Sequence, residues 1–248
     1  MGDRVKNYTL GNGAVMFKAD GEDNFRSLGN APDFKVGMKV EKKEHYSSET
    51  DVPLKDAEVI TKTESTGSFT LDEPHILNLT RYFLGDAATS SIQTHGTVTA
   101  TDVTAVHDAY VHLNKIEVSN VVVKNTAGTT TYVEGADYTV VKGQGLLMAL
   151  STGAITDNQA LKVSYDYAAA TVQTGNAALT PSLKGHLWFV GNPSKGEKID
   201  IMGYVSLTPN GTIDMIGADW MKMQIDFGFM THPDYPGLFK YSTRGLKA

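Results

Sequence analysis

The sequence predicts an all-β protein with one short helix, and three observations lead to this fold class. Residues 221–229 alternate strictly between apolar and polar side chains, which is the period of a strand with one buried face. Seven of the eight prolines lie between alternating apolar runs, where strands should end because proline lacks the N–H of a sheet ladder. Only residues 74–84 carry apolar side chains at helical spacing.

The first part of the chain predicts strands at residues 14–18, 34–41 and 59–71. In the second of these, the apolar residues occupy every other position from Phe34 to Val40. Residues 41–56 then break the alternation and predict a long charged loop. A loop of this length inside a compact domain usually has a function. Because it contains no nucleophile–base pair and no glycine cradle, we expect it to contact another protein chain. The candidate contact residues are Glu41, Lys42, Lys43, Glu44, His45, Tyr46, Glu49, Asp51, Lys55 and Asp56.

The helix predicted at residues 74–84 has start and stop signals of its own. Asp72 is a suitable N-cap, Pro74 lies in the first turn and Gly85 follows the last turn. Ile76, Leu79 and Phe83 form an apolar stripe, so we expect the helix to pack over a sheet.

The composition changes near residue 95. Residues 95–175 are rich in Thr, Val and Ala, contain no arginine, and have glycines at the spacing of short antiparallel strands. This segment predicts a small immunoglobulin-like β-sandwich, with turn-like segments at residues 86–91 and 173–178. We expect it to be inserted into a first domain formed by residues 1–94 and 176–248, because exposed loop tips tolerate insertions.

The last part of the chain returns to long strands. Residues 183–190 and 198–207 are predicted strands, the second with Ile199, Ile201, Val205 and Leu207 on one face. Residues 208–211 are a strong turn signal before the strand at 221–229.

The overall charge and composition exclude several classes of protein. A net charge of −6 argues against a general nucleic-acid binder, but it suits a wall past which DNA must slide. The chain has no cysteine, so we expect neither disulfides nor thiolate metal sites. We find no signal peptide and no membrane helix, and we therefore expect a soluble protein made in the cytoplasm, with no membrane partner.

We predict no enzyme and no cofactor, and we assign no catalytic, cofactor-binding or metal residues. None of the seven histidines has the spacing of a metal ligand pair. Glycoside hydrolysis is the main catalytic alternative, with Trp188 or Trp220 as a sugar platform. The carboxylates that such a hydrolase would use do not favour a catalytic site, because they alternate outward from strands as solvent-facing residues do. They are Asp200, Asp214, Asp219 and Asp226.

The chain resembles the tube-forming major tail proteins of tailed bacteriophages, specifically those of siphovirus type. The resemblance is carried by the approach to a strand at residues 24–32, the segment 44–48 at the head of the charged loop, the helix at 74–84 and the late β region. It covers roughly residues 8–90 and 180–235. Residues 132–140 also resemble a turn-and-strand pattern of small β modules in phage virion proteins.

The resemblance implies a β-sandwich or half-barrel with one flanking helix. Subunits would join into rings, usually hexameric, that stack into a hollow tail tube through which DNA is ejected. The loop at residues 41–56 would contact the adjacent ring, and Gln224 and Asp226 would be candidates for the lumen wall. The implied partners are further copies of the chain, a tape measure protein, a tail terminator and a distal tail protein. The protein would be located in the virion tail after assembly in the host cytoplasm.

The physical chemistry of strand edges supports the same expectation, since an unpaired edge strand pairs readily with another chain and a head-to-tail contact can close into a ring. An inserted domain about 25 Å across would not fit in a tube that carries DNA, so we expect it to face outward. An outward insert leaves little room for a sheath, which predicts a non-contractile tail. Three alternatives remain open: a secreted carbohydrate-binding or adhesin-like module, a hydrolase, and the tube of a bacterial injection machine.

Overall fold

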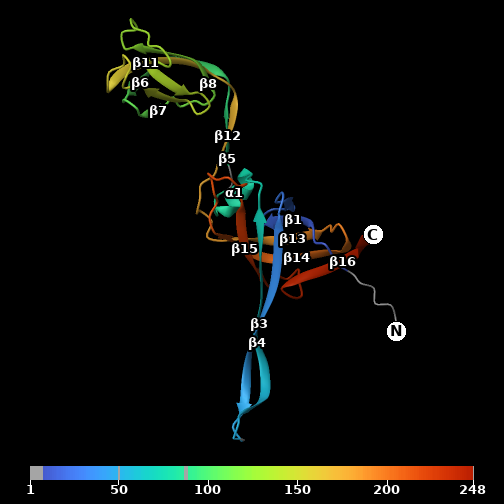
Figure 1. Ribbon diagram of the computed structural model, residues 1–248. Coiled ribbons are helices and arrows are strands. Elements are labelled where there is room, and N and C mark those ends of the chain that lie inside the picture. Colours follow the sequence, from blue (N-terminus) through green and yellow to red (C-terminus); the bar gives the residue numbers. More distant parts are fainter. Residues whose placement is uncertain (1–7, 50, 87–88, 248) are drawn as a thin grey trace. The chain divides into compact units, whose positions relative to one another are not determined.

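The computed structural model describes residues 8–49, 51–86 and 89–247, and its described part holds sixteen strands and one helix (Figure 1). The expectation of an all-β protein with a single short helix is confirmed. The chain divides into two compact units. Unit 1 consists of Met1–Ala88 and Gly175–Ala248, and unit 2 consists of Thr89–Thr174.

Unit 1 is built on one antiparallel sheet of eight strands. Seven of them lie in the order β2-β1-β13-β14-β15-β4-β3, and β16 pairs with β14. The long strand β14 therefore has two partners on one side, β16 along its first half and β15 along its second half. The elements are β1 (Gly13–Ala19), β2 (Arg26–Ser27), β3 (Asp33–Ser47), β4 (Leu54–Leu71), α1 (Ile76–Tyr82), β13 (Leu183–Gly191), β14 (Gly196–Asn210), β15 (Met223–Met230) and β16 (Phe239–Lys247).

The sheet of unit 1 curls around its own core. Phe34 on β3 stacks at 4.6 Å on Phe189 of β13, although three strands separate β3 from β13 in the sheet. The buried face of β15 supplies Met223, Ile225 and Phe227 to this core, as the strict alternation of its sequence predicts. Burial of these large apolar side chains stabilises the curled arrangement.

Two features of the late strands differ from the sequence prediction. β14 continues through Pro209 to Asn210, so the turn begins later than residue 208. Within β14, Ile199 is exposed whereas Asp200 is buried, because the β14–β16 pairing shifts register between residues 197 and 199 and Arg244 on β16 binds the Asp200 carboxylate. β16 itself was not predicted, since its sequence has few apolar residues.

The helix is shorter than predicted, and Leu79 of the predicted stripe packs against the core, but the fully buried residues of the helix are others. α1 begins after His75, whose ring accepts the N–H of Leu77, while Asp72 instead accepts a hydrogen bond from the side chain of Asn30. Its buried residues are Asn78, Arg81 and Tyr82, whereas Phe83 is exposed. The polar members of this face are buried because they have partners in the unit. The Asn78 amide donates to Leu28 O, and the Arg81 guanidinium lies over the ring of Phe17.

Unit 2 contains two three-stranded sheets that share one core. One sheet has the order β6-β11-β8 and the other has the order β7-β10-β9. Leu147 on β10 and Val163 on β11 are fully buried in the same cluster, which makes the unit a small β-sandwich. Its elements are β5 (Thr89–Gln93), β6 (Gly96–Ala105), β7 (Tyr110–His112), β8 (Val118–Asn125), β9 (Tyr138–Val141), β10 (Leu146–Ala149), β11 (Gln159–Tyr167) and β12 (Ala170–Thr174).

A two-stranded ribbon of β5 and β12 replaces the turn-like segments expected around residues 86–91 and 173–178. β5 is the first strand of unit 2 in the sequence and β12 is the last. The two strands pair antiparallel, from Thr89 with Thr174 to Gln93 with Ala170. The Gln93 side chain then hydrogen bonds to the backbone of Ile116 and Ala168. The immunoglobulin-like topology and the outward position of this unit stay predictions.

Candidate assembly site

The segment predicted as a charged loop is a β-hairpin, and this is the main correction to the sequence analysis. β3 continues to Ser47 and β4 begins at Leu54, so most of residues 41–56 are in paired strands. Before Thr66, β4 pairs with β3 alone, because its pairing with β15 covers only Thr66–Leu71. We call this two-stranded part, residues 38–65, the arm. The sequence pattern misled the prediction because residues 42–46 and 54–58 are exposed on both faces, so no apolar period marks the strands there.

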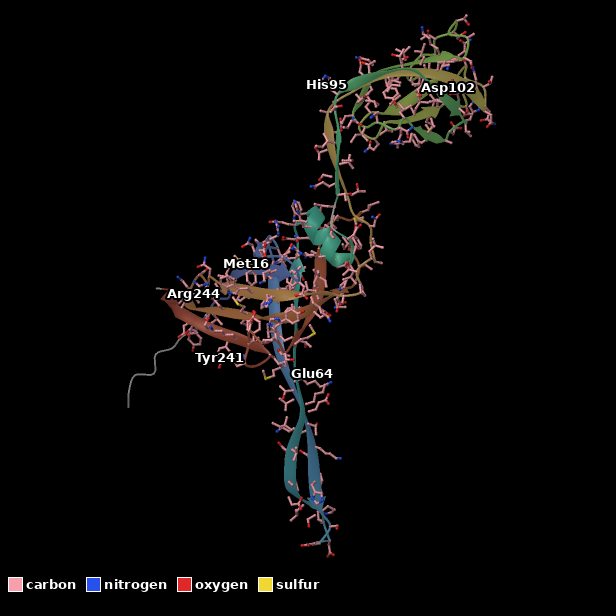
Figure 2. The ribbon with its side chains drawn as sticks, turned by 180° about the vertical axis from the view of Figure 1, so that it is seen from behind. Met16, Glu64, His95, Asp102, Tyr241 and Arg244 are labelled. Carbon is pink, nitrogen blue, oxygen red and sulfur yellow. The ribbon has the colours of Figure 1, made fainter. Side chains whose placement is uncertain are left out.

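The arm extends past the rest of the unit 1 sheet (Figure 1). Its side chains project on both sides from Glu64 near its base towards the tip (Figure 2). Of the ten candidate contact residues, eight lie in its two strands, while Glu49 and Asp51 lie in the connection between them. The structure therefore brings these ten residues together on one projecting element.

One face of the arm carries a chain of ion pairs that crosses between the strands. Lys42 and Lys55 each lie 2.5 Å from a carboxylate oxygen of Glu58, and Lys55 lies 2.5 Å from Glu44. The Tyr46 hydroxyl donates to Glu44 at 2.6 Å. The Lys42 and Lys55 ammonium groups lower the pKa of Glu58 to about 2, and Lys55 lowers the pKa of Glu44. These contacts fix the register of strands that have no core of their own.

The arm also exposes large apolar side chains. The exposed fractions of Met38, Leu54, Val59 and Ile60 lie between 59% and 63%. A two-stranded hairpin is at best marginally stable in water, and exposed apolar side chains along it are available to another molecule. The arm therefore has the properties of an element that another chain covers.

The outer face of the sheet is polar, and it includes both residues predicted for a lumen wall. Gln224 and Asp226 alternate with the buried side chains of β15 and point away from the core. Asn210 donates to the Asp226 carboxylate at 2.8 Å. Residues in register with this pair on the flanking strands also have hydroxyl, amide or charged side chains. They are Thr208 and Asn210 on β14, Ser68 and Thr70 on β4, and Asp33 and Lys35 on β3. We call this surface the polar face.

The polar face is hollowed rather than flat. A shallow depression of about 750 Å³ lies over β3, β4, β14 and β15, and Lys35, Ser68, Thr208 and Asp226 contribute to its walls. Its lining contains no histidine, and its one aromatic residue, Phe227, is buried in the core of the unit. The depression thus offers hydroxyl, ammonium and carboxylate groups without an exposed ring on which a base or a sugar could stack.

Two long strands of unit 1, β3 and β16, each have a single partner strand within the described residues. β3 pairs only with β4, and β16 pairs only with β14. Each strand therefore exposes backbone N–H and C=O groups along one edge. Such edges accept a strand from another molecule unless they are covered.

Two of the four carboxylates considered for hydrolysis have other partners, and the other two are exposed. The buried Asp200 accepts hydrogen bonds from Arg244 and from the Gly191 N–H. Asp226 is bonded to Asn210. Asp214 and Asp219 lie exposed in the connection between β14 and β15, where Trp220 is also exposed. We therefore find no support here for the hydrolase alternative.

Two further observations concern groups that the sequence analysis did not assign. No helix in the described residues is long and apolar enough to cross a membrane. One group of potential metal ligands occurs in the described part of the chain, formed by His186, His232 and Asp234. Sequence reasoning missed it because the two histidines are distant in sequence and meet only through the sheet.

Comparison with known proteins places the chain in a family. Residues 8–241 match the family described as "Protein of unknown function UCP028589". The chain belongs to this family. It is also similar to a tail sheath protein of Burkholderia phage BcepMu, with 29% identity over 123 residues. This match covers 48% of the chain and 26% of that phage protein, so the chain spans about a quarter of the relative's length.

Proposed function

We propose that this protein is a structural, non-catalytic component of a phage tail that assembles with copies of itself. The arm carries the proposal, because it extends from the sheet with exposed apolar side chains and without a core. The similarity to a phage tail sheath protein supports a role in a phage tail. Such a component would be found in the virion.

The finer proposal is a tail tube made of stacked rings. The unpaired edges of β3 and β16 lie on different strands, so a contact between the β3 edge of one copy and the β16 edge of the next would be head-to-tail and could close into a ring. The arm would then reach a neighbouring ring. The polar face, with Gln224 and Asp226, would line the lumen, where a hydrated surface in an acidic protein lets DNA pass without binding tightly. The hexameric ring number and the tape measure, terminator and distal tail partners rest on the family resemblance.

A second assignment, tail sheath, is favoured by the name of the phage relative. A sheath subunit encloses a tube, whereas a tube subunit forms the hollow filament itself. The two assignments therefore differ in what the purified chain does alone. The expectation of a tail without a sheath receives no support from this relative and stays a prediction.

Negative-stain microscopy of the concentrated chain tests the proposal. We expect rings or hollow filaments from the wild-type protein. A variant in which an Asn-Gly turn replaces residues 42–61, joining the directly paired Glu41 and Lys62, should keep the fold of unit 1 but lose stacking. A matched control, Lys42→Arg, keeps the positive charge that pairs with Glu58 and should still assemble.

Two results would contradict the proposal. One is a wild-type chain that stays monomeric in sedimentation experiments at high concentration. The other is an armless variant that forms filaments as long as those of the wild type. Assembly that occurs only when a preformed tail tube is added would favour the sheath assignment instead.

A further inference from the structure

We propose that His186, His232 and Asp234 form a binding site for a divalent transition-metal ion such as zinc. Their potential ligand atoms all lie within 4.8 Å of one another. Two imidazoles and one carboxylate are a donor set that zinc takes in proteins. The site would fasten residues 231–238, which connect β15 to β16, onto the strand β13.

His186 is already oriented in the way that metal-binding histidines are. It lies buried on β13, and its Nδ1 is 2.9 Å from the hydroxyl of the buried Tyr235. The ring of Tyr204 packs against the His186 ring at 5.4 Å. Histidine ligands usually have their second nitrogen bonded to such a partner, which fixes the ring and presents the other nitrogen to the metal. Here the nitrogen left for a metal is Nε2.

The charges around His186 are compatible with a bound cation. Burial lowers the pKa of His186, which favours the neutral imidazole that ligates metals, and Lys18 on the adjacent strand β1 contributes to the same shift. Lys18 would also repel a cation. Asp20 and Asp234 act on His186 in the opposite sense, so the carboxylates offset this lysine.

The other two ligands come from one tight turn. The Tyr235 N–H donates to His232 O at 3.0 Å, and Pro233 occupies the second position of this four-residue turn. The turn places the Asp234 carboxylate 3.6 Å from His232 Nδ1 and the His232 ring 4.8 Å from the His186 ring. Three ligands from a rigid strand and a rigid turn are thus held near one point.

Metal binding would require only a small closure. Zinc bonds of about 2.0–2.2 Å in tetrahedral geometry place neighbouring ligand atoms roughly 3.3–3.5 Å apart. The ligands must therefore approach by an ångström or slightly more. The exposed Asp234 side chain can make this movement, since 65% of its surface is accessible. Water would complete the coordination.

The experiment uses the full-length, tag-free protein after treatment with a chelator. Zinc binding is measured by titration calorimetry, and thermal unfolding is followed with zinc or with magnesium. The test variants are His232→Gln and Asp234→Asn. The matched control is His45→Gln, because His45 also contacts an aspartate, Asp56 at 2.5 Å, but has no second histidine in its group.

We expect zinc, but not magnesium, to raise the melting temperature of the wild type and of His45→Gln by several degrees. Zinc affinity should fall by about tenfold or more in each test variant, since loss of even an outer-shell partner has effects of this size. The ring-proton resonances of His186 and His232 should shift together on zinc addition. A wild type that does not bind zinc, or a His232→Gln variant that binds it as tightly as the wild type, would overturn the proposal. Because binding is measured on the folded chain, its failure leaves the assembly proposal unaffected.

Discussion

At the residue scale, the arm is held by charge rather than by burial. Glu58 forms ion pairs with Lys42 on the opposite strand and with Lys55 on its own strand. Exposed ion pairs contribute little individually, but a connected set restricts the register of a hairpin that lacks a core. The chain thus obtains a defined arm from residues that carry no hydrophobic signal.

The ion pairs of the arm predict a specific dependence on pH. The pKa of Glu58 is about 2 in the folded arm, below its ordinary value of 4.5, because Lys42 and Lys55 stabilise the carboxylate. Between these values the unfolded arm binds more protons than the folded arm. The stabilisation should therefore be complete above pH 4.5 and be lost progressively as the pH falls towards 2.

Nuclear magnetic resonance of the arm's Hα and carboxyl carbons over this range measures the effect. In Glu58→Gln the pH-dependent loss of order should be smaller, because the titrating carboxylate is absent. An arm whose Hα shifts keep their strand values between pH 7 and pH 2 would contradict the prediction.

At the element scale, the base of the hairpin depends on one close approach between strands. Gly67 on β4 lies opposite Val36 on β3 and Phe227 on β15. A Cβ at this position would lie 2.1 Å from Lys35 O and 2.4 Å from the Phe227 ring. The glycine therefore lets three strands meet at the place where the arm leaves the sheet.

Gly67→Ala should lower the free energy of unfolding by about 2 kcal/mol, because the backbone of Lys35 and the buried Phe227 must both shift. Chemical denaturation measures this change. Gly37→Ala is the matched control in the same hairpin, since its Cβ would meet only Thr66 O at 3.8 Å. Equal effects of the two substitutions would show that the close approach at Gly67 does not limit stability.

At the scale of the whole molecule, unit 2 is an interruption of unit 1. The two ends of unit 1 around it are joined by hydrogen bonds between Asp86 and Asn176, whose backbone and side-chain groups lie 2.8–3.2 Å apart. The core of unit 1 includes no residue of Thr89–Thr174. The fold of unit 1 therefore does not require the segment between them.

Replacing residues 89–174 by a short Gly-Ser linker should leave unit 1 folded and able to assemble, because the Asp86–Asn176 contacts still close the gap. Circular dichroism and thermal unfolding check the fold, and negative-stain microscopy checks assembly. If unit 2 faces outward, the filaments should become thinner while the bore keeps its width. A deletion variant that folds but has a wider bore would place unit 2 on the inside instead.

The sequence by itself determined the local features of this protein. The strict alternation of β15, the proline positions and the single helical segment predicted the fold class, because the period of a buried face is set by backbone geometry alone. The same reasoning selected the charged segment at residues 41–56 as the candidate contact region. It failed on the form of that segment, since a hairpin exposed on both faces has no hydrophobic period.

Only the tertiary structure decided which distant residues meet. The partner of Asp200 is Arg244, on a strand that the sequence did not predict. His186 meets His232 because β13, which carries His186, and β15, which precedes His232, both pair with β14. The curled sheet also decided which polar side chains share one face with Asp226. These contacts depend on strand order and register, which arise from the packing of the whole core and not from the pattern of any one segment.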